Sequence, residues 1–336
     1  MKIAFFEITR DEEINFFKEK LSQHDLFFSK EPLDANPISN AKDFDLISVF
    51  VSSKIDAAAL NELPNLKAVF PRSTGFDNID VNTAKQKNIP VSNVPAYGSH
   101  TVAEFTFSLI LNLTRKTYLA INRVKTEKNF SFEGFRGMDL FGKTLGVIGT
   151  GKIGSNVMRI AKSFGMEIMA FDTFPNHDLA NDLKFRYCSL DLVLQSSDIV
   201  TIHVPYNKET HHLLNSSNLQ LIKQGSLLIN TSRGGVVETD ALFKALSGGR
   251  ISGAALDVLE EEEELKEEIE LLSKNAIPQE KYKNILEDHM LISLPQVIIT
   301  PHMAFYTKEA EQSIRQTTVD NINSFLSGAP QNIVNG

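Results

Sequence analysis

A glycine-rich turn in the middle of the chain constrains the fold more than any other feature of the sequence. The segment Gly149–Gly154 (GTGKIG) follows the apolar run TLGVI, typical of a buried strand, and precedes a segment with the apolar spacing of a helix. In this strand–turn–helix context, the pattern G-x-G-x-x-G is typical of dinucleotide-binding units. Gly149 permits the tight turn, Gly151 lets the backbone approach a pyrophosphate, and Gly154 lets the helix pack closely on the strand. The sequence therefore predicts a nucleotide-binding α/β unit that begins well after the N-terminus.

The strand expected after this helix ends in an acidic residue that selects the cofactor. The run MEIMAF is followed by Asp172, eighteen residues after Gly154. A carboxylate at this position accepts hydrogen bonds from the adenosine ribose hydroxyls and repels a 2′-phosphate. Residues 173–176 include no arginine that would favour such a phosphate. The sequence therefore predicts NAD rather than NADP, with the phosphates at the helix N-terminus formed by Lys152 and Ile153.

Short apolar runs alternate with helical patterns over most of the chain. Several runs are almost entirely apolar, as in strands buried on both faces of a parallel sheet, so we expect a doubly wound α/β fold. A chain of 336 residues is long enough for two such domains. The first run is followed by TRDEE rather than by glycines, so the first domain is expected to lack the nucleotide. The expected strands are Ile3–Ile8, Asp45–Val51, Leu66–Phe70, Thr144–Ile148, Glu167–Phe171, Ile199–Val204, Leu227–Asn230, Ala254–Val258 and Val297–Thr300.

The longest helical pattern begins at Ser99, after Pro95, and continues to about Glu127. Apolar residues recur along it at helical spacing, and Thr101 and Glu104 are placed to form a capping box. A helix of this length either bridges two domains or buries an apolar face against a second subunit. The pattern allows both uses.

Charge is concentrated in one segment of the chain. The sequence carries 34 basic and 42 acidic side chains, and Glu260–Glu270 alone contains eight glutamates and one lysine. The rest is close to neutral, so a broad basic surface for nucleic acid or anionic lipid is not expected. Cys188 is the only cysteine, which excludes an intrachain disulfide and a thiolate zinc site, and no metal is expected. Neither a signal-peptide core nor an apolar stretch long enough to cross a membrane is present, so a cytoplasmic location is expected.

Three polar residues lie just beyond apolar runs, where open α/β sheets bind their ligands. Arg233 follows LLINTS, His302 follows VIITP, and Glu262 lies five residues after Asp257. An arginine there binds a carboxylate through two parallel hydrogen bonds, a histidine exchanges a proton with a reacting oxygen, and a glutamate fixes the histidine ring. Hydride transfer between a 2-oxo acid and a 2-hydroxy acid requires such a set. The pattern also allows a loop histidine, a helix-capping arginine and a solvated glutamate, since nothing in it distinguishes Glu262 from its neighbours.

Six segments resemble the D-isomer-specific 2-hydroxyacid dehydrogenases, most closely their D-lactate dehydrogenase branch. They occur in the family's order, at family-like spacing, between about residues 45 and 325. They are PRSTGFDNID (71–80), NVPAYGSHTVAEFTFSLILNLTRK (93–116), GKTLGVIGTGKIG (142–154), INTSRGG (229–235), AALDVLEEE (254–262) and ITPHMAFYTKEA (299–310).

The resemblance implies a role for each residue of the polar set. Arg233 would hold the substrate carboxylate, His302 would be the acid/base, and Glu262 would pair with His302. NADH would reduce C2 of pyruvate to give D-lactate in a reversible reaction. The sequence departs from the family around this acid, because Leu259 stands where many relatives have an aromatic residue and Glu263 where many have proline.

The resemblance also implies positions that contact the substrate and the cofactor. Three aromatic rings around the substrate side chain favour a small apolar substituent, as in pyruvate, while backbone N–H groups anchor its carboxylate. The implied substrate positions are Phe50, Thr74, Gly75, Tyr97 and Phe305. The implied cofactor positions, besides the glycine turn and Asp172, are Val204, Pro205, Thr231, Ser232 and Asp257.

The expected architecture consists of two doubly wound parallel-sheet domains with the substrate cleft between them. One is a flavodoxin-like substrate domain, formed by residues 1–98 and 302–336, and the other is a Rossmann-type NAD domain, formed by residues 99–301. A homodimer or larger homo-oligomer through the helix at 99–127 is implied mostly by the resemblance.

Other functions are compatible with parts of this pattern. The substrate could be a bulkier 2-oxo acid, glyoxylate or hydroxypyruvate. Formate dehydrogenase would pair its histidine with a glutamine, and phosphoglycerate dehydrogenase would need more cationic groups, so both are disfavoured. A protein of another class, an NAD-sensing corepressor-like binding protein, would use the same fold without turnover.

Overall fold

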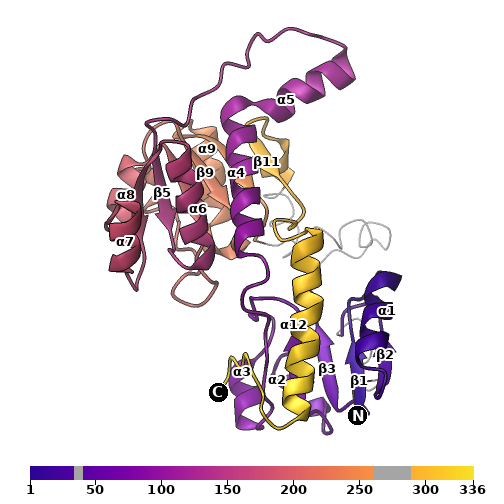
Figure 1. Ribbon diagram of the computed structural model, residues 1–336. Helices are drawn as coiled ribbons and strands as arrows, with labels where there is room; N and C mark the ends of the chain where they lie inside the picture. Colours follow the sequence, from indigo (N-terminus) through magenta and orange to yellow (C-terminus); the bar gives the residue numbers. More distant parts are fainter. Residues whose placement is uncertain (34–40, 261–288) are drawn as a thin grey trace. The chain divides into compact units, whose positions relative to one another are not determined.

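The computed structural model describes residues 1–33, 41–260 and 289–336. The chain divides into two compact units, Met1–Tyr97 with Tyr306–Gly336 and Gly98–Phe305 (Figure 1). The expected boundary at residue 302 differs from this division, which places His302 in the second unit. The reason is that the backbone N–H of His302 donates to the carbonyl oxygen of Asp257 at 2.9 Å.

The first unit contains a four-stranded parallel sheet with the order β2-β1-β3-β4. This is the order of flavodoxin-like sheets, and an isolated parallel bridge between Val69 and Val91 extends it beyond β4. The strands are β1 (Lys2–Phe5), β2 (Asp25–Phe28), β3 (Leu46–Val49) and β4 (Ala68–Pro71). The helices are α1 (Asp11–Lys20), α2 (Ala57–Glu62), α3 (Val81–Gln86) and α12 (Lys308–Leu326).

Alternate residues of these strands face two different cores, as the two-residue period of a strand requires. On one face, Ile3 and Phe5 pack with α1 and α12 in a cluster that includes Phe17 and Val319. On the other face, the intervening Ala4 belongs to a cluster that includes residues of α2 and α3. Helices cover both faces, so the expected doubly wound arrangement is confirmed for this unit.

The first strand is shorter than expected and ends at Phe5 rather than at Ile8. Glu7 has a φ of 58°, in the left-handed region, which does not continue a strand. The strand β2 was not expected from the sequence. Its four residues, DLFF, are exposed or half-buried in alternation rather than uniformly buried.

The second unit contains a seven-stranded sheet with the order β11-β10-β9-β8-β5-β6-β7, and its strand pairs are parallel. Apart from the added β11, this is the Rossmann order, and the two-unit parallel α/β fold is confirmed. The strands are β5 (Thr144–Ile148), β6 (Glu167–Phe171), β7 (Arg186–Tyr187), β8 (Ile199–Ile202), β9 (Ser226–Asn230), β10 (Ile251–Leu256) and β11 (Val297–Ile299). The α-helices of this unit that the structure describes in full are α4 (Ser99–Arg115), α5 (Thr117–Asn122), α6 (Lys152–Ser163), α7 (His177–Leu183), α8 (Leu190–Ser196) and α9 (Thr239–Ser247).

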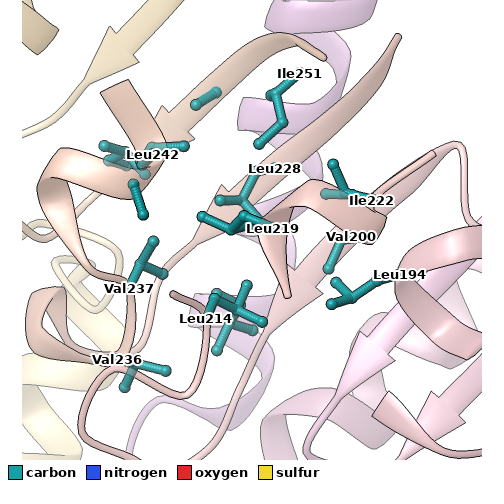
Figure 2. Packing of buried hydrophobic residues seen from close by; sticks show 14 of the residues in the cluster. Leu194, Val200, Leu214, Leu219, Ile222, Leu228, Val236, Val237, Leu242 and Ile251 are labelled. Atoms are coloured by element: carbon teal, nitrogen blue, oxygen red, sulfur yellow. The ribbon is translucent and has the colours of Figure 1, made fainter. Parts of the chain in front are cut away.

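Two apolar cores hold the helices of this unit against its sheet. On one face, Leu194 of α8 and Leu242 of α9 belong to the same cluster as Val200 and Leu228 of the sheet (Figure 2). On the other face, α4 and α6 contribute a second cluster that includes Phe107. In the part of the chain that the structure describes, no helix is both long enough and apolar enough to cross a bilayer.

The single helix expected from Ser99 to Glu127 is wrong. The helix α4 ends at Arg115, Lys116 has a φ of 50°, and α5 and a π-helical turn (Arg123–Glu127) follow. The chain returns to this point, where the N–H of Met138 donates to the carbonyl oxygen of Thr114 at 2.9 Å. This bond satisfies a carbonyl group that the end of a helix leaves without a partner. The expected capping box is also wrong, because the N-cap is Gly98 and no side chain caps the helix.

Candidate active site

Two glycines of the GTGKIG turn are required by close packing within the protein. A Cβ on Gly149, whose φ is 91°, would lie 2.6 Å from the carbonyl oxygen of His203. A Cβ on Gly154 would lie 2.0 Å from the carbonyl oxygen of Gly149. Both distances are shorter than real Cβ atoms show, so no larger residue fits without a shift of the backbone. The turn is therefore fixed in place between β5 and α6.

Gly151 differs from the other two glycines, because a Cβ there would meet no protein atom within 4 Å. Gly151 is the N-cap of α6, and Lys152 and Ile153 form the first turn of that helix. The first N–H groups of a helix have no partner inside it and favour a negative charge. The open space beside Gly151, together with this helix N-terminus, fits the pyrophosphate of a dinucleotide.

Asp172 follows β6 and is tied to the glycine turn. Its Oδ2 accepts hydrogen bonds from the N–H of Thr150 at 2.6 Å and from the Oγ1 of Thr150 at 2.9 Å. Its Oδ1 accepts one from the N–H of Phe174 at 2.8 Å. The Thr150 hydroxyl also lies 2.9 Å from the Tyr187 hydroxyl. The carboxylate thus fixes the turn, and Oδ1, which accepts a single hydrogen bond, keeps acceptor capacity for a ribose hydroxyl.

The loop after β8 contributes the predicted cofactor residues Val204 and Pro205. This loop lies against the turn, because the Cβ position of Gly149 is 2.9 Å from the Val204 side chain. The neighbouring His203 is half-buried, and desolvation of its ring lowers its pKa to about 3. His203 is therefore neutral at physiological pH, and its Nε2 lies 2.9 Å from the Thr201 hydroxyl.

The loop after β9 presents Arg233 from a turn held by Asn230. The Asn230 side chain accepts hydrogen bonds from the N–H and the hydroxyl of Ser232, at 3.0 and 2.8 Å. It also donates to the carbonyl oxygen of Arg233 at 2.9 Å. The hydroxyl of Thr231 lies 3.0 Å from that of Thr106 on α4. A Cβ on the next residue, Gly234, would lie 1.9 Å from the carbonyl carbon of Leu259, so the turn packs directly on the segment after β10.

His302 lies on the loop after β11, which is held by the carboxylate of Asp257. This carboxylate accepts hydrogen bonds from the hydroxyl of Thr300 at 2.5 Å and from the N–H groups of Met303 and Ala304 at 3.0 and 2.8 Å. Burial raises the pKa of Asp257, against the effect of these hydrogen bonds and of nearby His302. His302 has a φ of 50°, an uncommon conformation for a residue with a side chain. The loop geometry therefore depends on the carboxylate of Asp257, which accepts these three hydrogen bonds from this loop.

The acidic segment that follows Asp257 begins at Glu260, whose carboxylate has two partners in the structure. One oxygen of Glu260 lies 2.5 Å from Nε2 of His212, and the other accepts hydrogen bonds from the N–H and the hydroxyl of Thr239, at 3.2 and 2.7 Å. Glu260 therefore fixes the start of the acidic segment. The predicted dyad acid, Glu262, lies outside the described residues, so its pairing with His302 stays a prediction.

The substrate positions of the first unit lie on loops at the carboxyl ends of its strands. Thr74 donates its hydroxyl proton to the carbonyl oxygen of Val94 at 2.8 Å, and its own carbonyl oxygen accepts from Asn93 at 2.7 Å. The carbonyl oxygen of Gly75 accepts from the Ser73 hydroxyl at 2.6 Å. Phe50 is held at its N–H by Glu7 and at its carbonyl oxygen by Asn78, at 2.9 Å in both cases. Tyr97 is the last residue of the N-terminal part of this unit, and Phe305 is the last residue of the second unit.

Adjacent strands of the second sheet thus bring most of the expected residues to one edge. The carboxyl ends of β8, β5 and β6 carry the cofactor residues, and those of β9, β10 and β11 carry Arg233, Asp257 and His302. The order of strands reverses between β8 and β5, which is where open α/β sheets bind dinucleotides. In the described part of the chain, no three His, Cys, Asp or Glu side chains gather as metal ligands would.

A cavity of about 500 Å³ lies at the opposite edge of the same sheet. Its lining includes Gly225, Ser252 and Gln296, which stand where β9, β10 and β11 begin. None of the expected site residues lines it. This cavity is therefore separate from the candidate active site.

Comparison with known proteins assigns the family. The family profile described as "D-isomer specific 2-hydroxyacid dehydrogenase, NAD binding domain" matches residues 107–304, which include the glycine turn, Arg233 and His302. The chain belongs to the D-isomer-specific 2-hydroxyacid dehydrogenases. The protein is accordingly an NAD-dependent dehydrogenase, and the prediction of NAD as its cofactor is confirmed.

Relatives of the dehydrogenase match it over nearly its whole length. It is 37% identical to the 2-hydroxyacid dehydrogenase homolog of Zymomonas mobilis, over 98% of each chain. It is 35% identical to the aromatic 2-oxoacid reductase of Clostridium sporogenes, over 99% of this chain and 98% of that one. A solved structure of D-lactate dehydrogenase from Aquifex aeolicus, complexed with NAD and lactic acid, is 38% identical, with a TM-score of 0.91 over 99% of each chain.

Several residues that hold the dehydrogenase's loops were not identified from the sequence. In the second unit these are Asn230, Thr300, Thr150 and Tyr187, and in the first they are Glu7, Arg72 and Asn78. Asn230 and Thr300 lie within the matching segments INTSRGG and ITPHMAFYTKEA, so their position beside Arg233 and His302 was a usable signal. No pattern in the sequence marked Glu7, which stood within an expected strand.

Proposed function

We propose that this dehydrogenase is a D-lactate dehydrogenase, which transfers hydride reversibly between NADH and pyruvate. The observation that carries the proposal is the edge of the second sheet, where the Arg233 turn packs on the segment after β10 and the His302 loop is hydrogen-bonded to Asp257 in that segment. The full-length similarity to the A. aeolicus enzyme complexed with NAD and lactic acid supports the choice of substrate.

In the proposed reaction, Arg233 binds the carboxylate of the 2-oxo acid through two hydrogen bonds, a geometry that lysine does not provide. NADH, bound at the glycine turn and Asp172, supplies the hydride to C2. Protonated His302 donates its proton to the carbonyl oxygen, where negative charge develops. Glu262 pairs with His302 and keeps it protonated. In the reverse direction, neutral His302 accepts the proton from the 2-hydroxyl group.

Residues of the substrate loops select the acid in this proposal. The N–H groups near Thr74 and Gly75 anchor the carboxylate, while the rings of Phe50, Tyr97 and Phe305 surround the substituent on C2. Three rings leave space for a small apolar group, which favours pyruvate. Thr231, Ser232, Val204 and Pro205 complete the cofactor contacts, and the assignment of Asp257 to the cofactor stays a prediction.

A bulkier substrate is the second candidate, because the aromatic 2-oxoacid reductase of C. sporogenes is about as similar as the relatives named for lactate. The deciding experiment follows NADH oxidation with pyruvate, 4-methyl-2-oxopentanoate, phenylpyruvate, glyoxylate and hydroxypyruvate. We expect the highest kcat/KM with pyruvate and D-lactate as the product on a chiral column. A higher kcat/KM with phenylpyruvate than with pyruvate would make an aromatic 2-oxo acid the proposed substrate in place of pyruvate. NADH binding without turnover of any 2-oxo acid would favour the corepressor-like protein.

We also propose a homodimer, formed in part by the segment from α5 to residue 142. Phe130, Phe132 and Phe141 are more than 80% exposed, and Ile121 and Val124 are at least 42% exposed. Several large apolar side chains exposed within one segment are a reason to propose a protein interface there. The expected result is a dimer mass by light scattering and a monomer for the F130S/F132S double variant. A cytoplasmic location stays a prediction from the sequence.

A further inference from the structure

A partly buried charged network lies at the carboxyl ends of the first unit's central strands. In the sheet, β1 pairs with β3, and β3 pairs with β4. Beyond their ends lie Glu7, Phe50 and Arg72. The bonds among these residues join positions 43 and 65 residues apart in the chain. The proposed function uses only Phe50 of this group.

Glu7 organises the loop that carries Phe50. Its carboxylate accepts hydrogen bonds from the N–H groups of Phe50, Ser52 and Ser53 at 2.9, 2.8 and 3.1 Å, and from the Ser53 hydroxyl at 2.5 Å. Four donors around one carboxylate fix its position. The φ of 58° at Glu7 is uncommon for a residue with a side chain and persists only where the surroundings impose it.

Arg72 lies beneath the same loop and is 2% exposed. Its Nη2 donates to the carbonyl oxygens of Phe6 and Glu7 at 2.6 and 3.1 Å. Arg72 therefore fixes the backbone of Glu7, whose carboxylate in turn binds the loop that carries Phe50. Its guanidinium carbon lies 6.0 Å from the centre of the Phe50 ring. A guanidinium at this distance is attracted to the face of an aromatic ring.

Phe50 is therefore restrained at three points. Its N–H is bound by Glu7, its ring faces Arg72, and its carbonyl oxygen accepts a hydrogen bond from Asn78 at 2.9 Å. Asn78 also donates to the carbonyl oxygen of Ser53 at 2.8 Å and closes the loop. The position of the ring is thus set by polar groups that do not belong to the predicted substrate contacts.

We propose that Glu7 and Arg72 are positioning residues that set the chain-length selectivity of this dehydrogenase. The inference rests on the proposed function, in which the Phe50 ring limits the space for the substrate's side chain. Glu7 and Arg72 act through Phe50, because the carboxylate is taken up by loop donors and the guanidinium is buried. Without them the ring moves, a longer 2-oxo acid gains space, and pyruvate loses a contact.

The test is Glu7→Gln, which keeps the shape of the side chain but removes its charge and one acceptor oxygen. One or two charge-assisted hydrogen bonds are lost, so we expect the ratio of kcat/KM for pyruvate to that for 4-methyl-2-oxopentanoate to fall about tenfold. The change should lie in KM, with kcat within about threefold, since the reacting groups are untouched. The Kd for NADH, which binds to the second unit, should stay constant.

Asp45→Asn is the matched control at the other end of the same sheet. Asp45 accepts a hydrogen bond from the N–H of Lys2 and pairs with Lys67, at 2.8 Å in both cases. Lys2 begins β1, Asp45 precedes β3 and Lys67 precedes β4. Like Glu7, Asp45 thus has a carboxylate that links residues of different strands, and the control removes its charge. We expect its selectivity ratio to stay within twofold of the wild type.

A double-variant cycle separates positioning from general stability. In a Phe50→Ala background, Glu7→Gln should change the selectivity ratio by less than twofold, because the residue through which it acts is gone. Arg72→Lys provides a second variant if its melting temperature shows that it folds, and hydrogen exchange at Phe50, Ser52 and Ser53 should rise in Glu7→Gln.

The outcomes distinguish this inference from the proposed function. A wild type that reduces 2-oxo acids and a Glu7→Gln variant with an unchanged ratio would overturn the inference alone. An equal effect of Glu7→Gln with and without the Phe50 ring would overturn it as well. A wild type that binds NADH but reduces no 2-oxo acid would overturn the proposed function, and the inference with it.

Discussion

The two units hold the loops at the ends of their parallel sheets by partly different means. In the second unit, carboxylates such as Asp257 bind the loops, and backbone also packs on backbone at Gly149, Gly154 and Gly234, at distances that a Cβ would not permit. In the first unit, the loops around Phe50 are bridged by charged side chains, Glu7 and Arg72, without such close backbone packing. The backbone packing fails by steric overlap, and the charged bridge fails when a buried charge loses its partner.

This difference matches what each unit is proposed to do. A dinucleotide needs the backbone itself to approach its phosphates, which requires glycines and a fixed turn. In the proposed function, the Phe50 ring must lie at a fixed distance from the side chain of the substrate. The side chains of Glu7 and Arg72 fix the loop that carries this ring. We therefore expect variants at the carboxyl edge of the second unit's sheet to lose catalysis or folding. Variants at the carboxyl edge of the first unit's sheet should alter substrate selectivity.

The largest expected effect is at the second edge, in His302→Gln. Glutamine cannot supply the proton to the carbonyl oxygen, so kcat should fall about 10³-fold, within the usual range for loss of an acid/base group. The Kd for NADH, measured by fluorescence, should stay within twofold. His177→Gln, on the exposed side of α7, is the control and should keep full activity. Turnover in His302→Gln above a tenth of wild type would remove His302 from the mechanism.

Two glycine variants test whether backbone packing and cofactor contact are separable. Gly154→Ala should destabilise the protein by about 1–3 kcal/mol, because its Cβ would overlap a backbone oxygen. Gly151→Ala should leave the urea midpoint unchanged and weaken NADH binding roughly tenfold, because the added methyl group meets no protein atom but occupies the phosphate's space. Equal losses of stability in both variants would contradict the assignment of Gly151 to the pyrophosphate.

Two glutamates near the end of β10 should separate proton chemistry from loop positioning. Glu262→Gln should lower the apparent pKa in the kcat/KM profile by about one unit, since a neighbouring carboxylate favours protonated histidine. Glu260→Gln should lower the melting temperature, because it weakens the contacts with His212 and Thr239, and should leave that pKa in place. A shift in Glu260→Gln or Glu261→Gln without one in Glu262→Gln would move the dyad to that residue.

Local patterns in the sequence predicted the second unit well. The strand–turn–helix around Gly149 and the strands β5 and β6 have the expected bounds, since the apolar runs and glycines that define them are contiguous. The break at Lys116 was not predictable, because it depends on the return of Met138 to the end of α4. Helix propensity within residues 99–127 carries no information about the hydrogen bond between Met138 and Thr114.

The carboxyl edge of the first unit was the least predictable part of the site. Phe50, Thr74 and Gly75 were identified through a resemblance, but the residues that hold Phe50 were not. Glu7 and Arg72 act on loops far away in the sequence. Arg72 lies within the matching segment PRSTGFDNID, but no spacing marks Glu7. Charged side chains are mostly exposed, so a buried arginine and a half-buried glutamate have no signature in composition or periodicity.

The smallest expected effect concerns the cost of burying charge at that edge. Glu13 on α1 lies 3.6 Å from Nε of Arg72, yet burial raises the pKa of Glu13, against the effect of Arg72 and two other arginines. Burial also lowers the pKa of Arg72, so both partners indicate that desolvation outweighs their pairing.

The sign of the pH dependence follows from this raised pKa. A carboxyl group with a raised pKa in the folded state stabilises the fold below its unfolded pKa, about 4.3, and loses that contribution as the pH rises through the folded value. The free energy of unfolding of the wild type should therefore fall relative to Glu13→Gln between about pH 4 and neutrality. Asp80→Asn should give the opposite slope, because hydrogen bonds from Thr83 lower the pKa of Asp80. Urea titrations at a series of pH values measure both slopes, and equal signs would mean that pairing with Arg72, rather than burial, dominates at this edge.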